Sequence, residues 1–325
     1  MRLAIVGTVV DDRILHTDGT ETRSLGGIYY TVAVAANLCP PEWEILPICR
    51  AGQDILPRLE AKLGRYPNVN LRWVQPSRRA NTRVTLVYRT ALERDEYTTP
   101  PMAPLSAGEL EPALDTDACL VNFITGRDVK LSALSWFAEH YLGLLYLDLH
   151  SLTLGIGPDG KRYVRYPQRW RSYARIPDVL QMNEREAACL SRKPMKSGSF
   201  ENVIAFFRDF LNSSQTRPAV VNITLGPAGS AVLWRSPEGG VRAQRVPPAA
   251  VEVVDPTGCG DTFAVGFLCS YLLRRNPVEA ARYANLVAGL KCFLKGSEGL
   301  PKLRTLLDRM KEGTAGESLT ERPTV

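Results

Sequence analysis

A glycine-rich turn near residue 258 carries the clearest candidate for chemistry in the chain. It reads Val253-Val254-Asp255-Pro256-Thr257-Gly258-Cys259-Gly260-Asp261, and an apolar stretch follows that predicts a helix over 261–275. Two glycines let the backbone approach an anion closely, and the first turn of a helix offers free amides at its positive end. Such amides suit a phosphoryl group in transfer, and the Asp261 carboxylate could take the proton of an attacking hydroxyl. The segment therefore predicts an anion hole beside a general base.

Spacing alone leaves a structural role open for the same residues. Asp261 could cap the helix, and the two glycines could serve close packing. We expect Cys259, which lies between them, to be a small filler and not a nucleophile, because no histidine adjoins it in the sequence.

A second glycine-rich segment, Gly155-Ile156-Gly157-Pro158-Asp159-Gly160-Lys161, fits two phosphate-binding patterns, G-x-G-x-x-G and G-x-x-x-x-G-K. Both patterns require a helix to begin at the last glycine. The next residues, 162–167, are strand-like and end in proline, and Arg162 stands where the second pattern needs a hydroxyl. Because Pro158-Asp159-Gly160 favours a turn, we expect a surface turn here and not a nucleotide site.

Four motifs resemble those of the ribokinase/PfkB family of carbohydrate kinases. The segment from Asp255 to Asp261 resembles the family's D-T-x-G-A-G-D signature. Ser24-Leu25-Gly26-Gly27 resembles its N-terminal di-glycine segment, Asn183-Glu184-Arg185-Glu186 its N-x-x-E motif, and Thr224 to Gly229 its T-L-G-x-x-G turn. The four stand in the family's order, and the resemblance covers nearly the whole chain, from about Leu3 to about Gly296.

The resemblance implies a transfer of the ATP γ-phosphoryl group to an alcohol of a small acceptor, assisted by Mg²⁺. Asp261 falls on the catalytic base, and Gly258, Cys259 and Gly260 fall on the anion hole. Asn183 and Glu186 fall on residues that organise Mg²⁺, commonly through water; a helix cap is the structural alternative, and both roles can hold together. Thr224, Gly226, Gly229 and Asn285 fall on the nucleotide site of the family. The acceptor site corresponds to Asp12 or Asp11, Gly26, Gly27 and Thr31. Members often use a monovalent cation such as K⁺, and Asp255 and Thr257 fall on its site.

Some positions depart from the family pattern. Pro256 replaces the usual threonine, and Cys259 the usual alanine, without removing an amide from the anion hole. After Gly27, Ile28-Tyr29-Tyr30-Thr31 replaces the Lys-Gly-Ala-Asn of ribokinases, which weakens the case for ribose and removes a lysine that would suit a phosphorylated sugar. The two tyrosines could meet a ring or simply pack the helix. We expect an uncharged sugar, sugar alcohol or nucleoside as acceptor, unless Arg83 or Arg89 enters the pocket.

The elements that must position these residues alternate along the chain. Short β-branched runs predict strands, and longer periodic stretches between them predict helices. Strands are expected at 3–6, 43–48, 71–74, 118–123, 144–147, 179–182, 219–224 and 251–254, and helices at 28–38, 56–64, 129–142, 200–211, 261–275 and 277–294. This order favours an α/β fold with a doubly wound, mostly parallel sheet flanked by helices.

Two stretches interrupt the alternation. Residues 14–25 and 81–99 alternate between polar and apolar side chains and contain turn residues, so they predict a small β-sheet lid outside the main sheet. The open edges of such a lid could also pair with a second copy in a homodimer. We expect one kinase domain over 1–311 that includes the lid, and a frayed tail over 312–325.

Composition excludes several classes of protein. The chain of 325 residues is 45% hydrophobic and 23% charged, as ordinary globular proteins are, and no apolar run approaches the roughly 18 residues of a membrane span. The net charge of +6 is spread along the chain, which argues against nucleic acid as a partner. Residues 1–10 faintly resemble a signal peptide but lack a cleavage site, so we expect a buried first strand. A soluble, cytoplasmic protein with a small-molecule partner is expected.

Cysteine and histidine usage also favours a cytoplasmic protein, and it argues against a metal site made of these residues. The seven cysteines contain no C-x-x-C pair, which favours free thiols in a reducing compartment over disulfides or zinc. The three histidines are far apart in the sequence, so a histidine metal site is not expected.

Two alternatives from other classes stay open. One is a catalytically inactive regulator of the same fold that binds nucleotide or sugar, although Asp261, Asn183 and Glu186 argue against it. The other is a Rossmann-type oxidoreductase built on 155–160, which binding of NAD would reveal.

Overall fold

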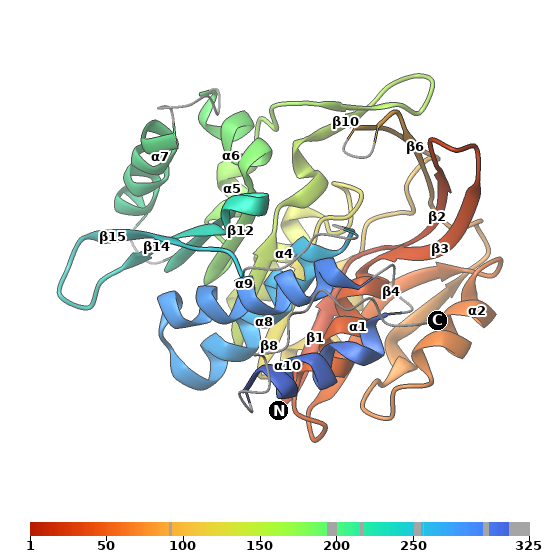
Figure 1. The fold of residues 1–325 in the computed structure, drawn as a ribbon, viewed down its shortest axis with the longest axis horizontal. Coiled ribbons are helices and arrows are strands. Elements are labelled where there is room, and N and C mark those ends of the chain that lie inside the picture. The colour runs from red at the N-terminus through yellow and green to blue at the C-terminus, as the bar shows by residue number, and fades with distance from the viewer. Residues whose placement is uncertain are drawn as a thin grey trace.

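A nine-stranded sheet runs through the protein and carries helices on both faces (Figure 1). The computed structural model describes residues 1–90, 93–193, 200–214, 217–249, 255, 257–294 and 299–311. The strand order is β15-β14-β13-β12-β9-β8-β1-β4-β5. The parallel strands are β1 (Arg2–Val6), β4 (Glu44–Gly52), β5 (Val74–Ser77), β8 (Ala118–Asn122), β9 (Leu144–Asp148), β12 (Val179–Asn183) and β13 (Val220–Thr224). Two antiparallel strands, β14 (Ser230–Arg235) and β15 (Val241–Val246), complete one edge.

Alternate side chains of the strands supply two separate cores. In β1, Leu3 and Ile5 face one core, whereas Ala4 and Val6 face the other. Helices α1 (Ile28–Leu38), α2 (Leu56–Leu63), α8 (Cys259–Arg274), α9 (Pro277–Phe293) and α10 (Leu303–Lys311) pack on the first face. Helices α3 (Ala107–Leu110), α4 (Leu131–His140), α5 (Trp170–Ala174), α6 (Glu184–Ser191) and α7 (Phe200–Ser213) pack on the second.

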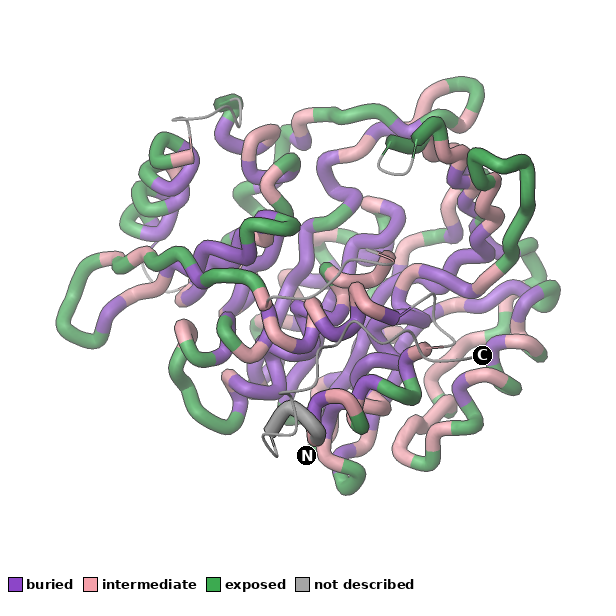
Figure 2. Tube along the Cα trace, viewed as in Figure 1, coloured by how far each residue is buried: buried purple, intermediate pink, exposed green. Residues whose placement is uncertain are grey.

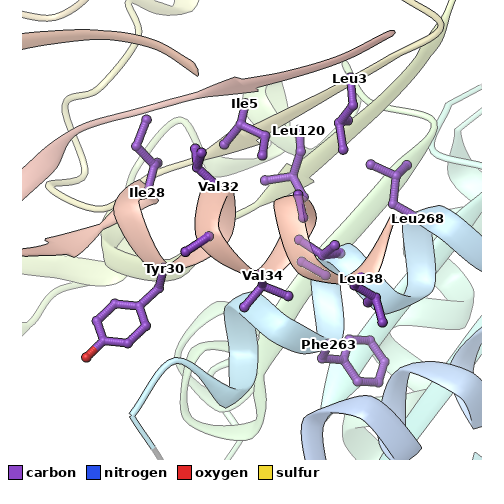
Figure 3. Close-up of a cluster of buried hydrophobic side chains, with 14 of the residues drawn as sticks. Leu3, Ile5, Ile28, Tyr30, Val32, Val34, Leu38, Leu120, Phe263 and Leu268 are labelled. Atoms are coloured by element: carbon purple, nitrogen blue, oxygen red, sulfur yellow. The ribbon is translucent and has the colours of Figure 1, made fainter. Parts of the chain in front are cut away.

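Helix α1 is buried on almost every side. Figure 3 shows Ile28 and Val32 pointing from α1 toward Ile5 of the sheet, while Tyr30 leaves the first turn on the other side. Figure 2 shows the same central region as an almost continuous buried band, with exposure concentrated in the outer loops and hairpins. A helix buried in this way fixes its first turn rigidly, which matters because that turn borders the site described below.

A second, four-stranded sheet covers the carboxyl ends of the central strands. Its order is β3 (Glu21–Gly27), β2 (Val9–Leu15), β6 (Arg83–Tyr88) and β7 (Arg94–Thr98). Strands β2 and β6 pair in parallel, and the two outer strands are antiparallel to their neighbours. The stretches 14–25 and 81–99, which interrupt the alternation of strands and helices in the sequence, therefore come together in one small sheet, as expected.

A short hairpin, β10 (Leu154–Ile156) and β11 (Arg162–Val164), lies against the outer strand of this lid sheet. The Thr98 amide donates to the Gly160 carbonyl at 2.9 Å, and Lys161 Nζ lies 2.7 Å from Asp95 Oδ1. The glycine-rich segment 155–161 thus forms a hairpin turn, and no helix begins at Gly160. The prediction of a turn is confirmed, and the structure lends no support to an oxidoreductase site there.

Most predicted elements of the main sheet form within a few residues of their expected bounds. The strand predicted at 71–74 is wrong: residues 71–73 form a 3₁₀ turn because Asn70 Oδ1 accepts from the Arg72 amide at 3.1 Å, and β5 begins only at Val74. Strands β10, β14 and β15 were not expected from the sequence, whereas β11 falls in the stretch 162–167 that reads as strand-like. The predicted strand 251–254 and the tail 312–325 lie outside the described residues. Among the described helices, none has the length and apolar character needed to cross a membrane.

Candidate active site

Two cavities meet at the glycine turn that begins α8. The larger, of about 720 Å³, is lined by Thr257, Gly258 and Asp261 together with residues of the lid sheet. The smaller, of about 300 Å³, is lined by Cys259 and Gly260 of the same turn. One stretch of backbone is therefore the wall between the two spaces.

The turn itself has the geometry of an anion hole. Gly258 precedes α8 with φ +77°, a left-handed conformation that favours glycine, and a Cβ there would lie 2.9 Å from the Tyr30 ring. Helix α8 begins at Cys259, so the amides of Cys259, Gly260 and Asp261 have no acceptor within the helix. Their direction and the helix dipole favour a negative charge at this point.

Asp261 is held by two donors on one of its oxygens. Thr31 Oγ1 and Asn122 Nδ2 donate to Asp261 Oδ1 at 2.9 and 2.7 Å. Burial raises the pKa of Asp261 to about 6, against the two hydrogen bonds and the charge of Lys291, which lower it. The side chain is therefore an oriented carboxylate at neutral pH. Thr31, predicted to bind the acceptor, is fully buried and positions Asp261 instead.

The di-glycine segment and Asp12 form one side of the larger cavity. Asp12, Gly27 and Tyr30 line it, and a Cβ on Gly26 would overlap the Asp12 carboxylate. Gly27 has φ +62°, and a Cβ there would collide with the Thr8 carbonyl, so this close approach requires glycine. Burial and the nearby charge of Glu96 raise the pKa of Asp12 to about 7.

Strand alternation decides between the two candidate aspartates. Asp12 points into the cavity, whereas Asp11 forms ion pairs with Arg58 and with Arg83. Tyr30 lines the cavity, whereas Tyr29 is buried in the core with Lys62 Nζ 5.9 Å from its ring. One tyrosine of the pair therefore borders the cavity and the other packs the helix.

The lid brings charges of both signs to the larger cavity. The cavity is lined by three arginines and five acidic residues: Arg89, Arg94, Arg185, Asp12, Glu93, Asp95, Glu96 and Asp261. The Arg89 Nη2 lies 2.9 Å from Asp95 Oδ2, and Arg94 Nη1 donates to the Tyr88 hydroxyl at 2.9 Å. The sequence-based expectation that Arg83 or Arg89 could enter is met by Arg89 and not by Arg83. The region after the di-glycine is uncharged, but the cavity as a whole is not.

The smaller cavity collects the predicted nucleotide residues. Thr224, Gly226, Gly229 and Asn285 all line it, and apolar side chains such as Pro227, Pro248 and Phe263 complete the wall. Asn285 donates through Nδ2 to the carbonyls of Val246 and Pro247 at 3.0 and 2.9 Å. The amide group of Asn285 therefore fixes the end of β15, and its oxygen is the atom left for a ligand.

Asn183 and Glu186 form a complete capping box at the start of α6. Asn183 Oδ1 accepts from the Glu186 amide at 2.9 Å, and Glu186 Oε2 accepts from the Asn183 amide at 2.8 Å. Desolvation raises the pKa of Glu186 to about 8, and it raises the pKa of the neighbouring Asp148 well above its usual value. Buried carboxyl groups of this kind gain from a nearby cation, and their hard oxygens suit Mg²⁺. No group of three or more His, Cys, Asp or Glu ligands gathers within the described ranges.

Cys259 is not a free thiol. It forms a disulfide with Cys292 of α9, whose Cα lies 6.3 Å away, and both residues line the smaller cavity. The sequence-based expectation of free cysteines is wrong for this pair, because the packing of α9 on α8 brings together residues that are 33 positions apart. Cys39, Cys49, Cys119, Cys189 and Cys269 are free, and all but Cys189 are buried.

Three polar residues of the site were missed in the sequence. Asn122 and Asp148 end their strands, and Gln181 lies near the end of β12, where its Nε2 donates to Asp148 Oδ2 at 2.9 Å and to the Gly260 carbonyl at 3.2 Å. A polar side chain at the carboxyl end of an apolar parallel strand was the available signal, since such ends gather at one edge of the sheet.

Comparison with known proteins relates part of the sequence to a family of kinases. Residues 161–303 match the model of the pfkB family carbohydrate kinases. The bifunctional protein HldE of Caulobacter sp. (strain K31) is 34% identical over 174 residues, which are 53% of this chain and 34% of that protein. The chain thus spans about a third of the length of that curated relative.

The whole fold is found in solved structures of ribokinase-family kinases. Arabidopsis thaliana ribokinase, solved with ribose and ATP, superposes with a TM-score of 0.72 over 95% of this chain and 98% of that one, at 20% identity. A pyrophosphate-dependent kinase in the ribokinase family, solved with a pyrophosphate analog and myo-inositol, gives 0.73 over 92% and 99%, at 16% identity. The protein therefore has the ribokinase-like fold. The resemblance to the ribokinase/PfkB carbohydrate kinases, inferred from four motifs, is confirmed.

Proposed function

We propose that this protein is an ATP-dependent kinase that transfers the γ-phosphoryl group to a hydroxyl of a sugar, sugar alcohol or nucleoside. One observation carries the proposal: the amide turn 258–261 separates two cavities, and the Asp261 side chain belongs to the larger one. Acceptor and donor can then meet at the turn from opposite sides. We take residues 1–311 as one kinase domain in which the four-stranded sheet is the lid.

Asp261 acts as the general base in this proposal. Its Oδ1 is occupied by Thr31 and Asn122, which orients the carboxylate and leaves Oδ2 for the acceptor hydroxyl. The hydroxyl oxygen attacks the γ-phosphorus as its proton moves to Asp261, and the bond from phosphorus to the bridging oxygen of the donor breaks. The amides of 258–261 stabilise the charge that develops on the transferring group.

Asn183 and Glu186 would hold Mg²⁺ through water, with Asp148 behind them. When bound, the ion would neutralise phosphate charge during transfer. The capping box fixes both side chains against the first turn of α6.

The smaller cavity favours ATP over pyrophosphate as the donor. Proline, alanine and phenylalanine side chains line much of its wall, which suits a flat base and contributes nothing to binding a bare pyrophosphate. Asp12 and Tyr30 support a polyhydroxylated acceptor, because a carboxylate accepts hydroxyl hydrogens and a tyrosine offers a flat face with a polar edge.

A panel of donors and acceptors tests the proposal. ATP and pyrophosphate are each combined with neutral sugars, polyols, nucleosides, sugar acids and sugar phosphates, with Mg²⁺ present, and phosphorylated product is measured. We expect product with ATP and a neutral acceptor. Asp261→Asn should lower kcat by on the order of 10² or more, because general-base catalysis typically contributes that much.

Asp209→Asn is the matched control, since Asp209 is exposed on α7 and lines neither cavity. Preference for a sugar acid or phosphosugar would overturn the neutral acceptor, and preference for pyrophosphate would overturn the donor. ATP binding without product from any acceptor would favour the inactive regulator.

A further inference from the structure

A lysine is buried beside the anion hole. Lys291 lies in the last turn of α9, and its side chain has no exposed surface. Its Nζ donates to the backbone carbonyl of Asp255 at 3.1 Å and to that of Leu294 at 3.5 Å, and it lies 3.8 Å from Asp255 Oδ2. Burial of an ammonium group costs free energy unless such acceptors surround it, so this position is built for a cation.

The acceptors of Lys291 belong to the backbone that leads into the amide turn. Asp255 Oδ1 accepts from the Thr257 amide at 2.9 Å, and the Asp255 amide donates to the Cys292 carbonyl at 2.9 Å. Lys291 therefore ties the last turn of α9 to the segment that enters Gly258. Its charge also reaches Asp261, whose pKa it lowers.

The Asp255 oxygens that face the Lys291 ammonium are also those that a monovalent cation would need as ligands. The resemblance places such an ion at Asp255 and Thr257, where carbonyl and carboxylate oxygens are the fitting ligands. Lys291 Nζ already faces two of these oxygens, and a second positive charge within a few ångströms would be repelled. The residues present do not fit a bound K⁺.

We propose that the Lys291 ammonium is a built-in cation that holds the entry to the amide turn, so that this enzyme works without K⁺. Lys291 is a positioning residue, because it acts through Asp255 and the turn and not on the substrate. The effect on rate rests on the proposed function, whereas the occupation of the site by lysine does not.

The first test uses the unmodified protein. Its kcat/KM and its Tm are measured at constant ionic strength in choline, Li⁺, Na⁺, K⁺ and NH₄⁺ chlorides. We expect both quantities to be the same in every salt within experimental error. A several-fold stimulation by K⁺, or a stabilisation specific to K⁺, would overturn the proposal.

The second test removes the charge and restores it from solution. Lys291→Ala leaves the oxygens and a space, whereas Lys291→Met fills the space without charge. In choline both variants should lose on the order of 10-fold or more in kcat, because a preorganised charge near the reacting group is missing. NH₄⁺ and K⁺ should restore rate and raise Tm in the alanine variant in a saturable way, and Li⁺ should not. The methionine variant should respond to none of them.

Lys302→Ala is the matched control, since Lys302 is exposed in the same part of the chain. A folded alanine variant with full activity in choline, or one that no cation stabilises or rescues, would overturn the proposal. If neither variant folds, the salt series on the unmodified protein decides. If no acceptor is phosphorylated in any salt, the proposed function fails, while the Tm series still tests the cation.

Discussion

Asp261 combines a raised pKa with a fixed orientation. Desolvation disfavours its charged form, and the hydrogen bonds from Thr31 and Asn122 favour it, which leaves the pKa at about 6. A base with this value is mostly deprotonated at neutral pH and still accepts a proton in the transition state. In the proposed reaction the two donors therefore act on the rate through Asp261, although neither lines the larger cavity.

The pH dependence of kcat should reflect the pKa of Asp261. Asp261 must be deprotonated to act, so kcat should fall as the pH drops below about 6, by about tenfold per unit. Thr31→Val removes a hydrogen bond that favours the carboxylate, so the pKa should rise and the acid limb should move to higher pH. Thr305→Val, at an exposed position of α10, should leave the limb in place. An unchanged limb in Thr31→Val would contradict the assignment of the limb to Asp261.

Contiguous motifs and strand patterns differ in the residues that they can single out. The family resemblance singled out Asp261, Gly258 and Glu186, because each lies in a contiguous motif; the first two line the larger cavity, and Glu186 lines neither cavity. Asn122 and Gln181 belong to no motif, and they reach the site only because parallel strands end at one edge. The choice of Asp12 over Asp11 likewise required the direction in which β2 faces the cavity.

At the scale of elements, the start of α6 serves two purposes. Glu186 completes the capping box, and in the proposed function its buried carboxyl group also serves to hold Mg²⁺. Because glutamine also accepts a capping hydrogen bond, a Glu186→Gln variant should keep the helix while losing the charge.

We therefore expect Glu186→Gln to raise the Mg²⁺ concentration needed for half-maximal rate without a large change in Tm. The control is Glu184→Gln, because Glu184 lies two residues earlier in the same first turn and is not part of the capping box. A Mg²⁺ titration identical to that of the unmodified protein would reduce Asn183 and Glu186 to a helix cap.

One buried arginine of the hairpin β10–β11, Arg162, connects the lid sheet to the main domain. Arg162 donates to Ser151 Oγ at 2.6 Å and to the Ile124 carbonyl at 3.2 Å, and its Nε lies 3.1 Å from Glu96 Oε1 of β7. Its side chain is 3% exposed, so the guanidinium is shielded from water. The glycines that resemble a phosphate loop thus serve a hairpin that joins the lid to the main domain.

Arg162→Met should loosen this connection. Glu96 would lose its buried partner next to the larger cavity, and the acceptor KM should rise by on the order of tenfold, since small misplacements of binding groups are costly. The KM for ATP should change far less, because the smaller cavity is remote from the hairpin. Arg165→Met, at an exposed position just past the same hairpin, should change neither KM. Equal effects on both substrates would indicate general destabilisation instead.

Element prediction failed where local signals were weak. Residues 230–246 form two antiparallel strands at the sheet edge, and their exposed positions carry arginines and turn glycines that dilute the strand pattern. The 3₁₀ turn at 71–73 depends on a side-chain cap from Asn70, which competes with an apolar run that alone resembles a strand. The long buried elements succeeded because their periodicity and their burial agree.

At the scale of the whole molecule, the protein is a rigid sheet with a smaller sheet over one end. The lid strands and the connection between β6 and β7 contribute Asp12, Glu96 and four other charged residues to the larger cavity, so an acceptor bound there would contact both sheets. Its outer strand β7 is covered by the hairpin, whereas β3 is an edge whose first residues are exposed. Pairing of β3 with a second copy is the form of homodimer that this edge would support.

Binding of acceptor should order the lid. In hydrogen exchange, residues 83–88 and 94–98 should become protected when the acceptor is added, because closure excludes water from the cavity. Helix α7, which lines neither cavity, serves as the internal reference. Protection confined to α8, with no change in the lid strands, would show that the lid does not respond to the acceptor. Sedimentation at several concentrations would separately decide whether β3 pairs with a second copy.

The parallel pairing of β2 with β6 also governs the order in which the chain can fold. The ion pair between Asp11 and Arg83 joins residues 72 positions apart, and β3, α1, β4, α2 and β5 lie between the two lid strands β2 and β6. A contact of such long range carries a large cost in chain entropy until the intervening units have collapsed. We therefore expect β2 and β6 to pair only after the units between them, from β3 to β5, have formed, so that the larger cavity is completed late in folding.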